Sequence, residues 1–338
     1  MVKAKKWVVK KYFDGVPMKS DFEIVEYELP PLKDGEILLK TEWISVDPYL
    51  RAYNRNYPLP YDQFSFQVGV VQETKNPNYP VGTRVVTHKG WCDYVIVKET
   101  KIVIGEFPKE ILYKLPDLQG LSPSLGVGAV GMPGVTAYFG FLEICQPKAG
   151  ETVVVTGAAG AVGSIVGQIA KIKGCKVIGF AGTDAKCQWL EQELGFTKAL
   201  NYKKVDAQSA LKAAAPQGVD CYFDNVGGEL SSIIIGQMNL RGRVAVCGSI
   251  SAYNEDPKKM PKATILQPPI IFKELRIEGL VVWRWLDRWS EGFTQLVSWI
   301  KSGQLKAAEH KTVGFDKLYD AFVGMLAGEN TGKAVVNV

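Results

Sequence analysis

Residues 152–171 read TVVVTGAAGAVGSIVGQIAK: a short apolar run, a glycine-rich turn and a stretch of small and β-branched residues. The run predicts a buried strand, and residues 161–173 have the pattern of a helix that ends at Gly174. A second strand over residues 176–180 completes a βαβ unit of the usual length. In such a unit, backbone N–H groups at the start of the helix bind the pyrophosphate of a dinucleotide. The stretch therefore predicts a dinucleotide-binding domain.

The glycine pattern in that turn is Ala158-x-Gly160-x-x-Gly163. Gly160 would let the pyrophosphate approach the backbone, and Gly163 would let the helix pack closely on the strand. Ala158 stands where the usual pattern has the first glycine of a tight turn. The motif is therefore weak alone and depends on its strand–turn–helix context; a turn that binds nothing is the alternative.

The end of the second strand indicates which cofactor is used. Sites for NAD place an Asp or Glu there for the ribose hydroxyls, whereas sites for NADP leave room and supply a cation for the 2'-phosphate. The strand ends in Ala181-Gly182-Thr183, with no acid on it. Asp184 is the one rival, since it lies about twenty residues past the glycine pattern, where a ribose-binding acid is sought, but it is typical of the first residue of the next helix. Lys186 follows on the first turn of that helix, where a solvated surface lysine is the alternative. The pattern favours NADPH.

The chain divides into two kinds of sequence. Residues 1–125 alternate short strand-like runs, at 36–43, 67–73, 83–87 and 91–97, with Pro and Gly turns, which predicts a β-rich, partly closed sheet. Residues 126–303 alternate strands and helices, as in a doubly wound α/β domain with six mostly parallel strands. Residues 304–338 return to a strand, a helix and a strand that we expect to pair with the first domain. The Pro-rich residues 253–272 are either a functional loop or a variable surface excursion.

Composition excludes several classes of protein. The 338 residues allow two domains, and 46% apolar with 22% charged residues is ordinary for a globular enzyme. A net charge of +5, from 40 basic and 35 acidic residues, is too balanced to predict a nucleic-acid partner. We find no signal-peptide pattern or membrane-spanning stretch, and the six cysteines form no C-x-x-C pair. We expect a cytoplasmic protein without a membrane partner.

The sequence offers no zinc site. Its only histidines, His88 and His310, are not at ligand spacing from a second metal-binding residue, and the cysteines do not cluster. Without a Lewis acid, reduction of an isolated ketone or oxidation of an alcohol loses its main stabilisation of the alkoxide. A conjugated alkene needs less help, because hydride addition at its β-carbon gives an enolate that one or two hydrogen-bond donors can stabilise.

A series of motifs makes the chain resemble the medium-chain dehydrogenase/reductase family, and within it the zinc-independent prostaglandin and alkenal double-bond reductases. The motifs are VDPYLR at 46–51, GMPGVTAY at 131–138, AAGAVG at 158–163, DNVGG at 224–228, CGSISAYN at 247–254 and GENTGK at 328–333. The resemblance covers essentially the whole chain. It implies a Rossmann domain with a GroES-like catalytic domain, NADPH as cofactor, and a homodimer that pairs near residues 275–282.

The resemblance also implies an activity. It is the reduction of the double bond of α,β-unsaturated ketones and aldehydes, including 15-oxo-prostaglandins and lipid-derived enals, and it leaves leukotriene 12-hydroxy dehydrogenation open. Two alternatives remain: an NADPH quinone reductase, and a non-catalytic NADPH-binding protein of the crystallin kind. Turnover on an enone and on quinones separates the three.

The implied site residues fall into two groups. Tyr253 and Tyr49 are candidate hydrogen-bond donors to the substrate oxygen, since a phenol is protonated at neutral pH. A core aromatic is the alternative for Tyr49. The cofactor-binding set is Gly160, Ala161, Val162, Gly163, Lys186, Tyr202, Asn225, Cys247, Gly248, Ser249, Ile250, Ser251, Ala252, Tyr253, Leu280, Val281, Val282 and Asn330.

Reasoning from the residues supports part of that set. Asn225 and Cys247 each follow a predicted strand, at the edge where a doubly wound sheet binds its ligand. Tyr202 ends the third strand, and a tyrosine packed on the core is its alternative. Further expectations are a substrate carboxylate at Arg51 or Arg55 and an apolar lining made by Trp283, Trp285 and Ile271.

Overall fold

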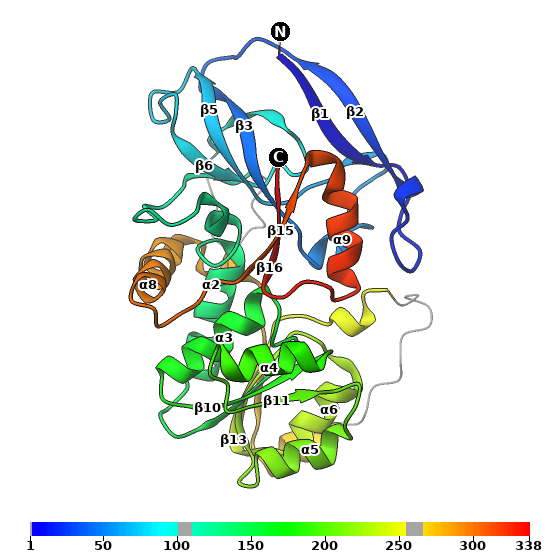
Figure 1. Cartoon of the computed structure of the whole chain (residues 1–338), viewed down its shortest axis with the longest axis vertical. Helices are drawn as coiled ribbons and strands as arrows, with labels where there is room; N and C mark the ends of the chain where they lie inside the picture. Colours follow the sequence, from blue (N-terminus) through cyan, green and yellow to red (C-terminus); the bar gives the residue numbers. More distant parts are fainter. Residues whose placement is uncertain (1, 101–109, 255–265) are drawn as a thin grey trace. The chain divides into compact units, whose positions relative to one another are not determined.

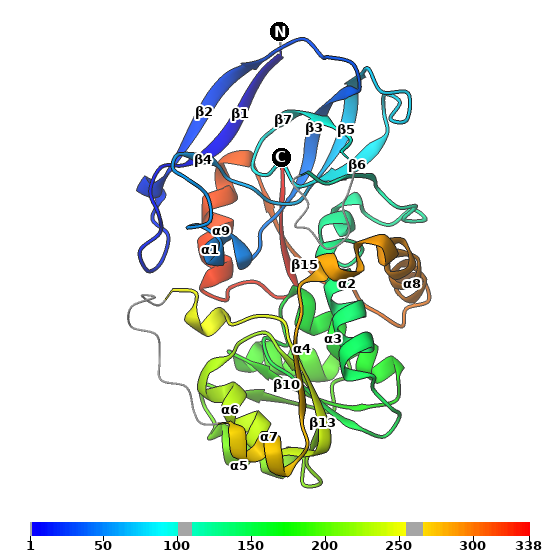
Figure 2. The same ribbon diagram turned by 180° about the vertical axis from the view of Figure 1, so that it is seen from behind.

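The computed structural model describes residues 2–100, 110–254 and 266–338. They form two compact units: unit 1 contains Met1–Met132 and Glu309–Val338, and unit 2 contains Pro133–Ala308 (Figures 1 and 2). Most of the Pro-rich stretch expected to be a loop, residues 255–265, lies outside the described residues. The part that follows forms the short helix α7, Gln267–Phe272.

Unit 1 is built on strands. A three-stranded sheet has the order β2-β1-β4, and a larger sheet has the order β15-β16-β3-β5-β6-β8, with β7 paired to β3. The strands are β1 Val2–Val9, β2 Phe22–Leu29, β3 Glu36–Ser45, β4 Tyr61–Asp62, β5 Gln67–Thr74, β6 Arg84–Thr87, β7 Tyr94–Lys98, β8 Leu112–Lys114, β15 Glu309–Val313 and β16 Lys333–Asn337. The unit also contains the helices α1, Tyr49–Ala52, and α9, Leu318–Leu326.

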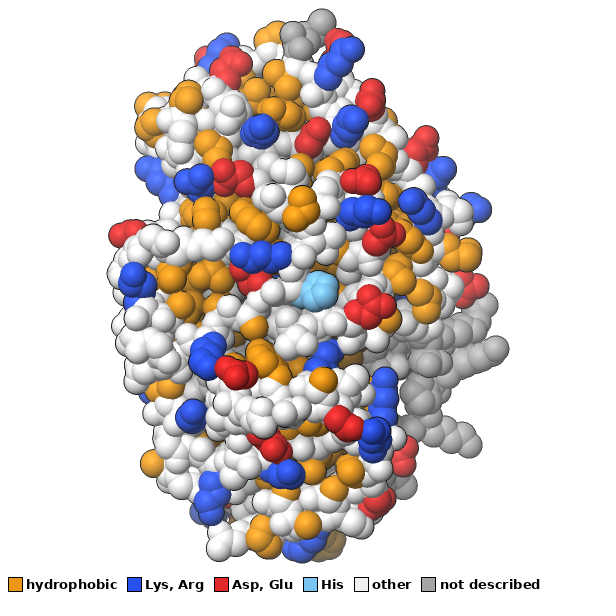
Figure 3. All heavy atoms as spheres, in the orientation of Figure 1, with side chains coloured by type: hydrophobic (Ala, Val, Ile, Leu, Met, Phe, Trp, Pro, Cys, Tyr) orange, Lys and Arg blue, Asp and Glu red, His pale blue; other side chains and the backbone are white. Residues whose placement is uncertain are grey.

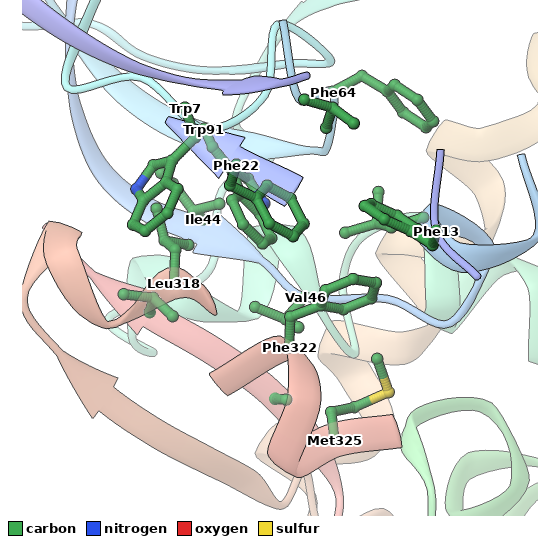
Figure 4. Packing of buried hydrophobic residues seen from close by; sticks show 14 of the residues in the cluster. Trp7, Phe13, Phe22, Ile44, Val46, Phe64, Trp91, Leu318, Phe322 and Met325 are labelled. Atoms are coloured by element: carbon green, nitrogen blue, oxygen red, sulfur yellow. The ribbon is translucent and has the colours of Figure 1, made fainter. Parts of the chain in front are cut away.

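The C-terminal segment is part of the core of unit 1. Strand β16 pairs antiparallel with β3, and α9 packs beside β1 and β2. Aromatic rings fill this core: Trp7 meets Trp91 edge-on at 6.0 Å, Phe22 stacks on Trp91, and Phe322 of α9 meets the same indole at 82° (Figure 4). Such ring pairs are worth about 0.5–1.5 kcal/mol each beyond their buried area.

Strand β1 was not anticipated from the sequence. Its segment VKAKKWVV looks charged, but Ala4, Trp7 and Val9 are nearly inaccessible, whereas Lys3 and Lys5 are exposed. Side chains alternate along a strand, so Ala4 points to the opposite face from Trp7 and Val9 and packs in a separate apolar cluster. The strand pairs along its whole length with β2.

On the face shown in Figure 3, basic and acidic side chains are interspersed, and neither sign of charge dominates a region.

Unit 2 is the expected doubly wound α/β domain. Its six-stranded sheet has the order β11-β10-β9-β12-β13-β14, and every pair of neighbouring strands is parallel. The strands are β9 Thr152–Val155, β10 Lys176–Ala181, β11 Lys198–Asn201, β12 Val219–Asp224, β13 Met238–Val246 and β14 Arg276–Gly279. The helices include α2 Met132–Phe139, α3 Ala161–Ile172, α4 Asp184–Gln192, α5 Ala207–Ala214, α6 Gly228–Gly236 and α8 Trp289–Lys301.

The strand order reverses between β9 and β12. Chain connections leave this point in opposite directions, so the carboxyl ends of these two strands border the crevice where such sheets bind their ligands. The fold thus defines the edge of unit 2 at which a site is sought.

Candidate functional site

The turn after β9 is shaped by two glycines. Gly157 has a φ of +59°, so the tight turn lies there and not at Ala158, where the sequence pattern had placed it. A Cβ on Gly163 would lie 2.4 Å from the carbonyl oxygen of Gly157, which only glycine avoids. A Cβ on Gly160 would meet only that same oxygen, at 3.2 Å, so the start of α3 remains open. Ala161, Val162 and Gly163 form its first turn.

Asp224 joins the two strands at the reversal of strand order. It ends β12, is 2% exposed, and accepts the N–H groups of Val226 and Gly227 at 2.9 Å. The hydroxyl of Ser231 donates to Oδ2 of Asp224 at 2.7 Å. The hydroxyl of Thr156, just after β9, donates to Oδ1 at 3.2 Å. The buried carboxylate is thus satisfied by neutral donors from both sides of the crevice.

Asn225 is held over the glycine turn by the same threonine. Its Nδ2 donates to the carbonyl of Thr156 at 2.7 Å, and its backbone N–H donates to the Thr156 hydroxyl at 3.1 Å. A Cβ on Gly157 would lie 3.3 Å from the Cβ of Asn225. The two connections that follow β9 and β12 therefore form one rigid assembly.

Residues 247–253, which follow β13, fold onto this assembly. The N–H groups of Cys247 and Gly248 donate to the Asp224 carbonyl, and the Ser251 hydroxyl donates to the Val226 carbonyl at 2.6 Å. Burial and the charge of Asp224 raise the pKa of the Cys247 thiol to about 12, so the thiol is neutral at physiological pH. Ile250 and Ala252 lie in a short 3-10 turn of this loop.

Tyr253 closes the loop. Its hydroxyl oxygen accepts the N–H of Ser249 at 3.3 Å and lies 3.3 Å from the position of a Cβ on Gly248. A hydroxyl that accepts in one bond still carries a proton that it can donate in another. The phenol is therefore placed at the carboxyl edge of the sheet, above the segment that follows β13.

The acid expected to compete for a ribose is already engaged. Asp184 accepts Asn201 Nδ2 at 2.6 Å and pairs with Lys204, and these partners lower the pKa of its carboxyl group. Lys186 lies on the first turn of α4, whose preceding residue Thr183 accepts its N–H at 3.2 Å. Tyr202, directly after β11, is 46% exposed, which rules out the alternative of a tyrosine packed in the core.

Residues 280–282 follow the edge strand β14. The N–H of Leu280 donates to the Val246 carbonyl at 3.0 Å, and its side chain packs where a Cβ on Gly140 would lie 2.8 Å away. Val281 is 54% exposed and Val282 is buried. The carboxyl edge of the unit 2 sheet thus carries every predicted cofactor residue except Asn330, which belongs to unit 1.

Tyr49 begins α1 in unit 1. Its hydroxyl lies 3.2 Å from Nε2 of His88, and its ring stacks on Phe64 at 6.1 Å. Burial raises the pKa of Tyr49 and lowers that of His88 to about 4, so both are neutral at pH 7. The sequence had given no sign of this partnership, because the two residues lie on different segments.

A buried ion pair connects the segments that carry Tyr49 and Asn330. Lys333 and Asp47 lie 3.2 Å apart with side chains 4% and 5% exposed, and Lys333 Nζ also donates to the carbonyls of Val46 and Ala334. Asn330 Nδ2 donates to the Gly332 carbonyl at 2.7 Å. The segment after β3 and the start of β16 are therefore joined by buried side chains inside unit 1.

The other residues expected to bind the substrate differ in burial and in partners. Arg51 is 6% exposed and its Nε donates to the Gly15 carbonyl, whereas Arg55 is exposed and lies over the ring of Tyr12. Trp285 is 5% exposed and stacks on Phe139, so its indole belongs to the core of unit 2. Ile271 is 67% exposed on α7.

Two searches of the described residues gave negative results. Their His, Cys, Asp and Glu side chains form no group of three or more that could hold a metal ion. None of the helices in that part of the chain combines the length and the apolar character that a membrane crossing requires.

Comparison with known proteins fits this geometry. A family model described as the N-terminal domain of oxidoreductase matches residues 5–104, and one described as zinc-binding dehydrogenase matches residues 161–302. Prostaglandin reductase 1 of Bos taurus is 49% identical over 338 residues, 99% of both chains. The chain belongs to the medium-chain dehydrogenase/reductase family.

Other members of this family are similar over the same length. An NADP(+)-dependent 2-alkenal reductase of Nicotiana tabacum is 36% identical, with 100% of this chain and 98% of that protein covered. The crystal structure of CurA from Vibrio vulnificus in complex with NADPH is 32% identical, covers 99% of each chain and has a TM-score of 0.90. The family and the fold class predicted from the motifs are thereby confirmed.

Removal of the Asp224 carboxylate tests its place in the site. Asp224→Ala leaves several buried donors unpaired and is expected to lower the free energy of unfolding of unit 2 by about 4 kcal/mol, whereas Asp224→Asn keeps an acceptor and costs about 1–2 kcal/mol. Urea unfolding gives the measurement. Asp206→Ala is the control, because Asp206 caps α5 with a backbone bond at 2.8 Å on the surface and its loss costs about 1 kcal/mol. Equal costs at both positions would contradict this role.

Proposed function

We propose that this chain uses NADPH to reduce the carbon–carbon double bond of α,β-unsaturated ketones and aldehydes, including 15-oxo-prostaglandins and lipid-derived enals. The observation that carries the proposal is the 49% identity to prostaglandin reductase 1 along 99% of both chains. The alkenal reductase and the NADPH complex of CurA support it. Unit 1 would be the catalytic domain, and the six free cysteines favour a reducing, cytoplasmic location.

The residues at the sheet edge fit a dinucleotide. The open start of α3 at Gly160 offers backbone N–H groups to a pyrophosphate, and Asn225 stands beside it. Lys186 and Tyr202 are proposed to bind the 2'-phosphate, while Lys204 keeps Asp184 from competing for a ribose hydroxyl. The remaining residues of the proposed set, 247–253, 280–282 and Asn330, would bind the rest of the cofactor. Bound NADPH supplies the hydride that adds to the β-carbon of the substrate.

The chain must then stabilise charge on the substrate oxygen. We assign this role to Tyr253, because its hydroxyl accepts from Ser249 and so can donate its own proton to the developing enolate. Tyr49 is the second candidate: in this role neutral His88 would donate its Nε2–H to the phenol oxygen of Tyr49, which leaves the Tyr49 proton for the substrate. Both phenols act here as donors and need no metal ion.

The direct test is NADPH consumption across a panel of substrates. Nonenal and a 15-oxo-prostaglandin are expected to be reduced much faster than simple quinones or saturated ketones, and oxidation of a leukotriene 12-alcohol is tested with NADP(+). Activity is expected to survive dialysis against a chelator, since the chain has only two histidines. Faster turnover of quinones would favour the quinone reductase alternative, and binding of NADPH without any turnover would favour the non-catalytic one.

Replacement of one hydroxyl tests the donor. Tyr253→Phe is expected to lower kcat for an enone by about tenfold or more while NADPH affinity stays within a few-fold, because the lost bond is strongest in the transition state. Steady-state kinetics and cofactor titration measure the two quantities. Tyr27→Phe, which removes a hydroxyl bonded to the Tyr94 carbonyl in unit 1, is the control. An unchanged kcat at saturation would remove Tyr253 from the catalytic role.

The oligomeric state is proposed to be a homodimer that pairs through β14 of unit 2. This strand ends the sheet, and the neighbouring Ile271, Phe272 and Val281 are 67%, 81% and 54% exposed. An edge strand flanked by exposed apolar side chains is normally covered. Sedimentation is expected to show a dimer that Phe272→Lys weakens, whereas the control Val81→Lys, at a 64% exposed residue of unit 1, does not. A monomer across a wide concentration range would refute the assignment.

A further inference from the structure

We propose that Lys203, whose side chain lies over Gly182, is a second cation for the 2'-phosphate of NADPH alongside Lys186. The proposal deepens the proposed use of NADPH and rests on it.

The side chain of Lys203 folds back over the end of β10. A Cβ on Gly182, which follows β10, would lie 3.5 Å from Cε of Lys203 and 3.3 Å from the hydroxyl oxygen of Tyr202. Strands β10 and β11 are parallel neighbours, with Ala181 opposite Asn201, so the residues after both strands emerge at the same edge. Because Gly182 has no side chain, the lysine stem and the tyrosine ring occupy the space above it.

Asn201 fixes the turn that carries Lys203. Its Oδ1 accepts the Lys203 N–H at 3.2 Å, and its backbone carbonyl accepts the Lys204 N–H at 2.9 Å. The same side chain donates Nδ2 to Asp184 at 2.6 Å. One buried asparagine therefore holds the backbone of two adjacent lysines and the carboxylate of the acid at the start of α4.

The two lysines differ in their partners. Lys204 forms an ion pair with Asp184, so its charge is largely compensated. Lys203 has no acidic side chain within ion-pair distance in residues 2–100, 110–254 and 266–338. Its charge instead acts on Lys186, whose pKa is lowered first by burial and then by Lys203.

Two cations placed close together are unfavourable unless an anion lies with them. A phosphate monoester carries up to two negative charges and accepts several hydrogen bonds, so it converts this repulsion into attraction. NADH lacks that group and would leave the repulsion between the two cations in place. The arrangement thus selects for the 2'-phosphate both by attraction and by the cost of its absence.

Cofactor binding to the full-length protein tests this directly. Dissociation constants for NADPH, NADH and adenosine 2',5'-bisphosphate are measured by calorimetry for the unmodified chain and for Lys203→Gln, Lys203→Arg and Lys186→Gln. Lys203→Gln is expected to weaken NADPH and the bisphosphate by about tenfold, the scale of one charged hydrogen bond, while NADH changes by less than about twofold. Lys203→Arg is expected to keep most of the affinity.

Lys176→Gln is the matched control. Lys176 is the first residue of β10 and Gly182 follows its last residue, so the variant removes the same charge at the other end of the strand. It is expected to bind all three ligands as the unmodified chain does, and melting temperatures check that every variant is folded.

The outcomes separate the two proposals. An unmodified chain that binds NADPH and NADH equally would overturn the proposed cofactor. A preference for NADPH that survives intact in Lys203→Gln, or that falls equally in Lys176→Gln, would overturn the role of Lys203 and leave the cofactor assignment in place.

Discussion

The carboxylate of Asp224 is the point on which the candidate site depends. It is buried at the reversal of strand order and receives hydrogen bonds from Thr156 after β9 and from the turn after β12. The backbone carbonyl of Asp224 accepts the N–H groups of Cys247 and Gly248, in the segment after β13. Three connections that are far apart in sequence are thereby held in one arrangement, and Asn225, Gly157 and Tyr253 take their positions from it. An arrangement held by its own hydrogen bonds has less conformational entropy to lose on binding.

Two acids of this sheet edge have different kinds of partner. Asp224 accepts hydrogen bonds from neutral donors. Asp184, at the surface, is paired with Lys204. An unpaired carboxylate at Asp184 would repel a phosphate and attract a ribose hydroxyl, and its pair with Lys204 reduces both effects. Under the proposed assignment of Lys186 and Lys203 to the 2'-phosphate, cofactor choice would depend on which lysine is compensated, rather than on the number of lysines present.

Much of unit 2 could be predicted from the sequence, because buried parallel strands appear as apolar runs such as residues 152–155 and helices begin after recognisable turns. The fold class and the edge that carries Asn225 followed from that pattern. Details set by tertiary contact did not. The positive φ at Gly157 depends on how the turn meets Asn225, and the backbone of Lys203 is held by Asn201. In β1, the lysines hid a strand that is buried on both faces, with Trp7 and Val9 on one face and Ala4 on the other.

The buried pair Lys333–Asp47 joins the C-terminal segment to the N-terminal part of unit 1, together with the pairing of β16 with β3. An unpaired charge at either position would be costly in this core, so the pair makes β16 and the segment after β3 depend on each other. Tyr49 follows Asp47 by two residues and Asn330 precedes Lys333 by three. One ion pair therefore positions a candidate donor from the N-terminal part of the chain and a candidate cofactor ligand from the C-terminal part. The ion pair that joins β16 to the segment after β3 is thus also the contact that relates the positions of these two candidate residues.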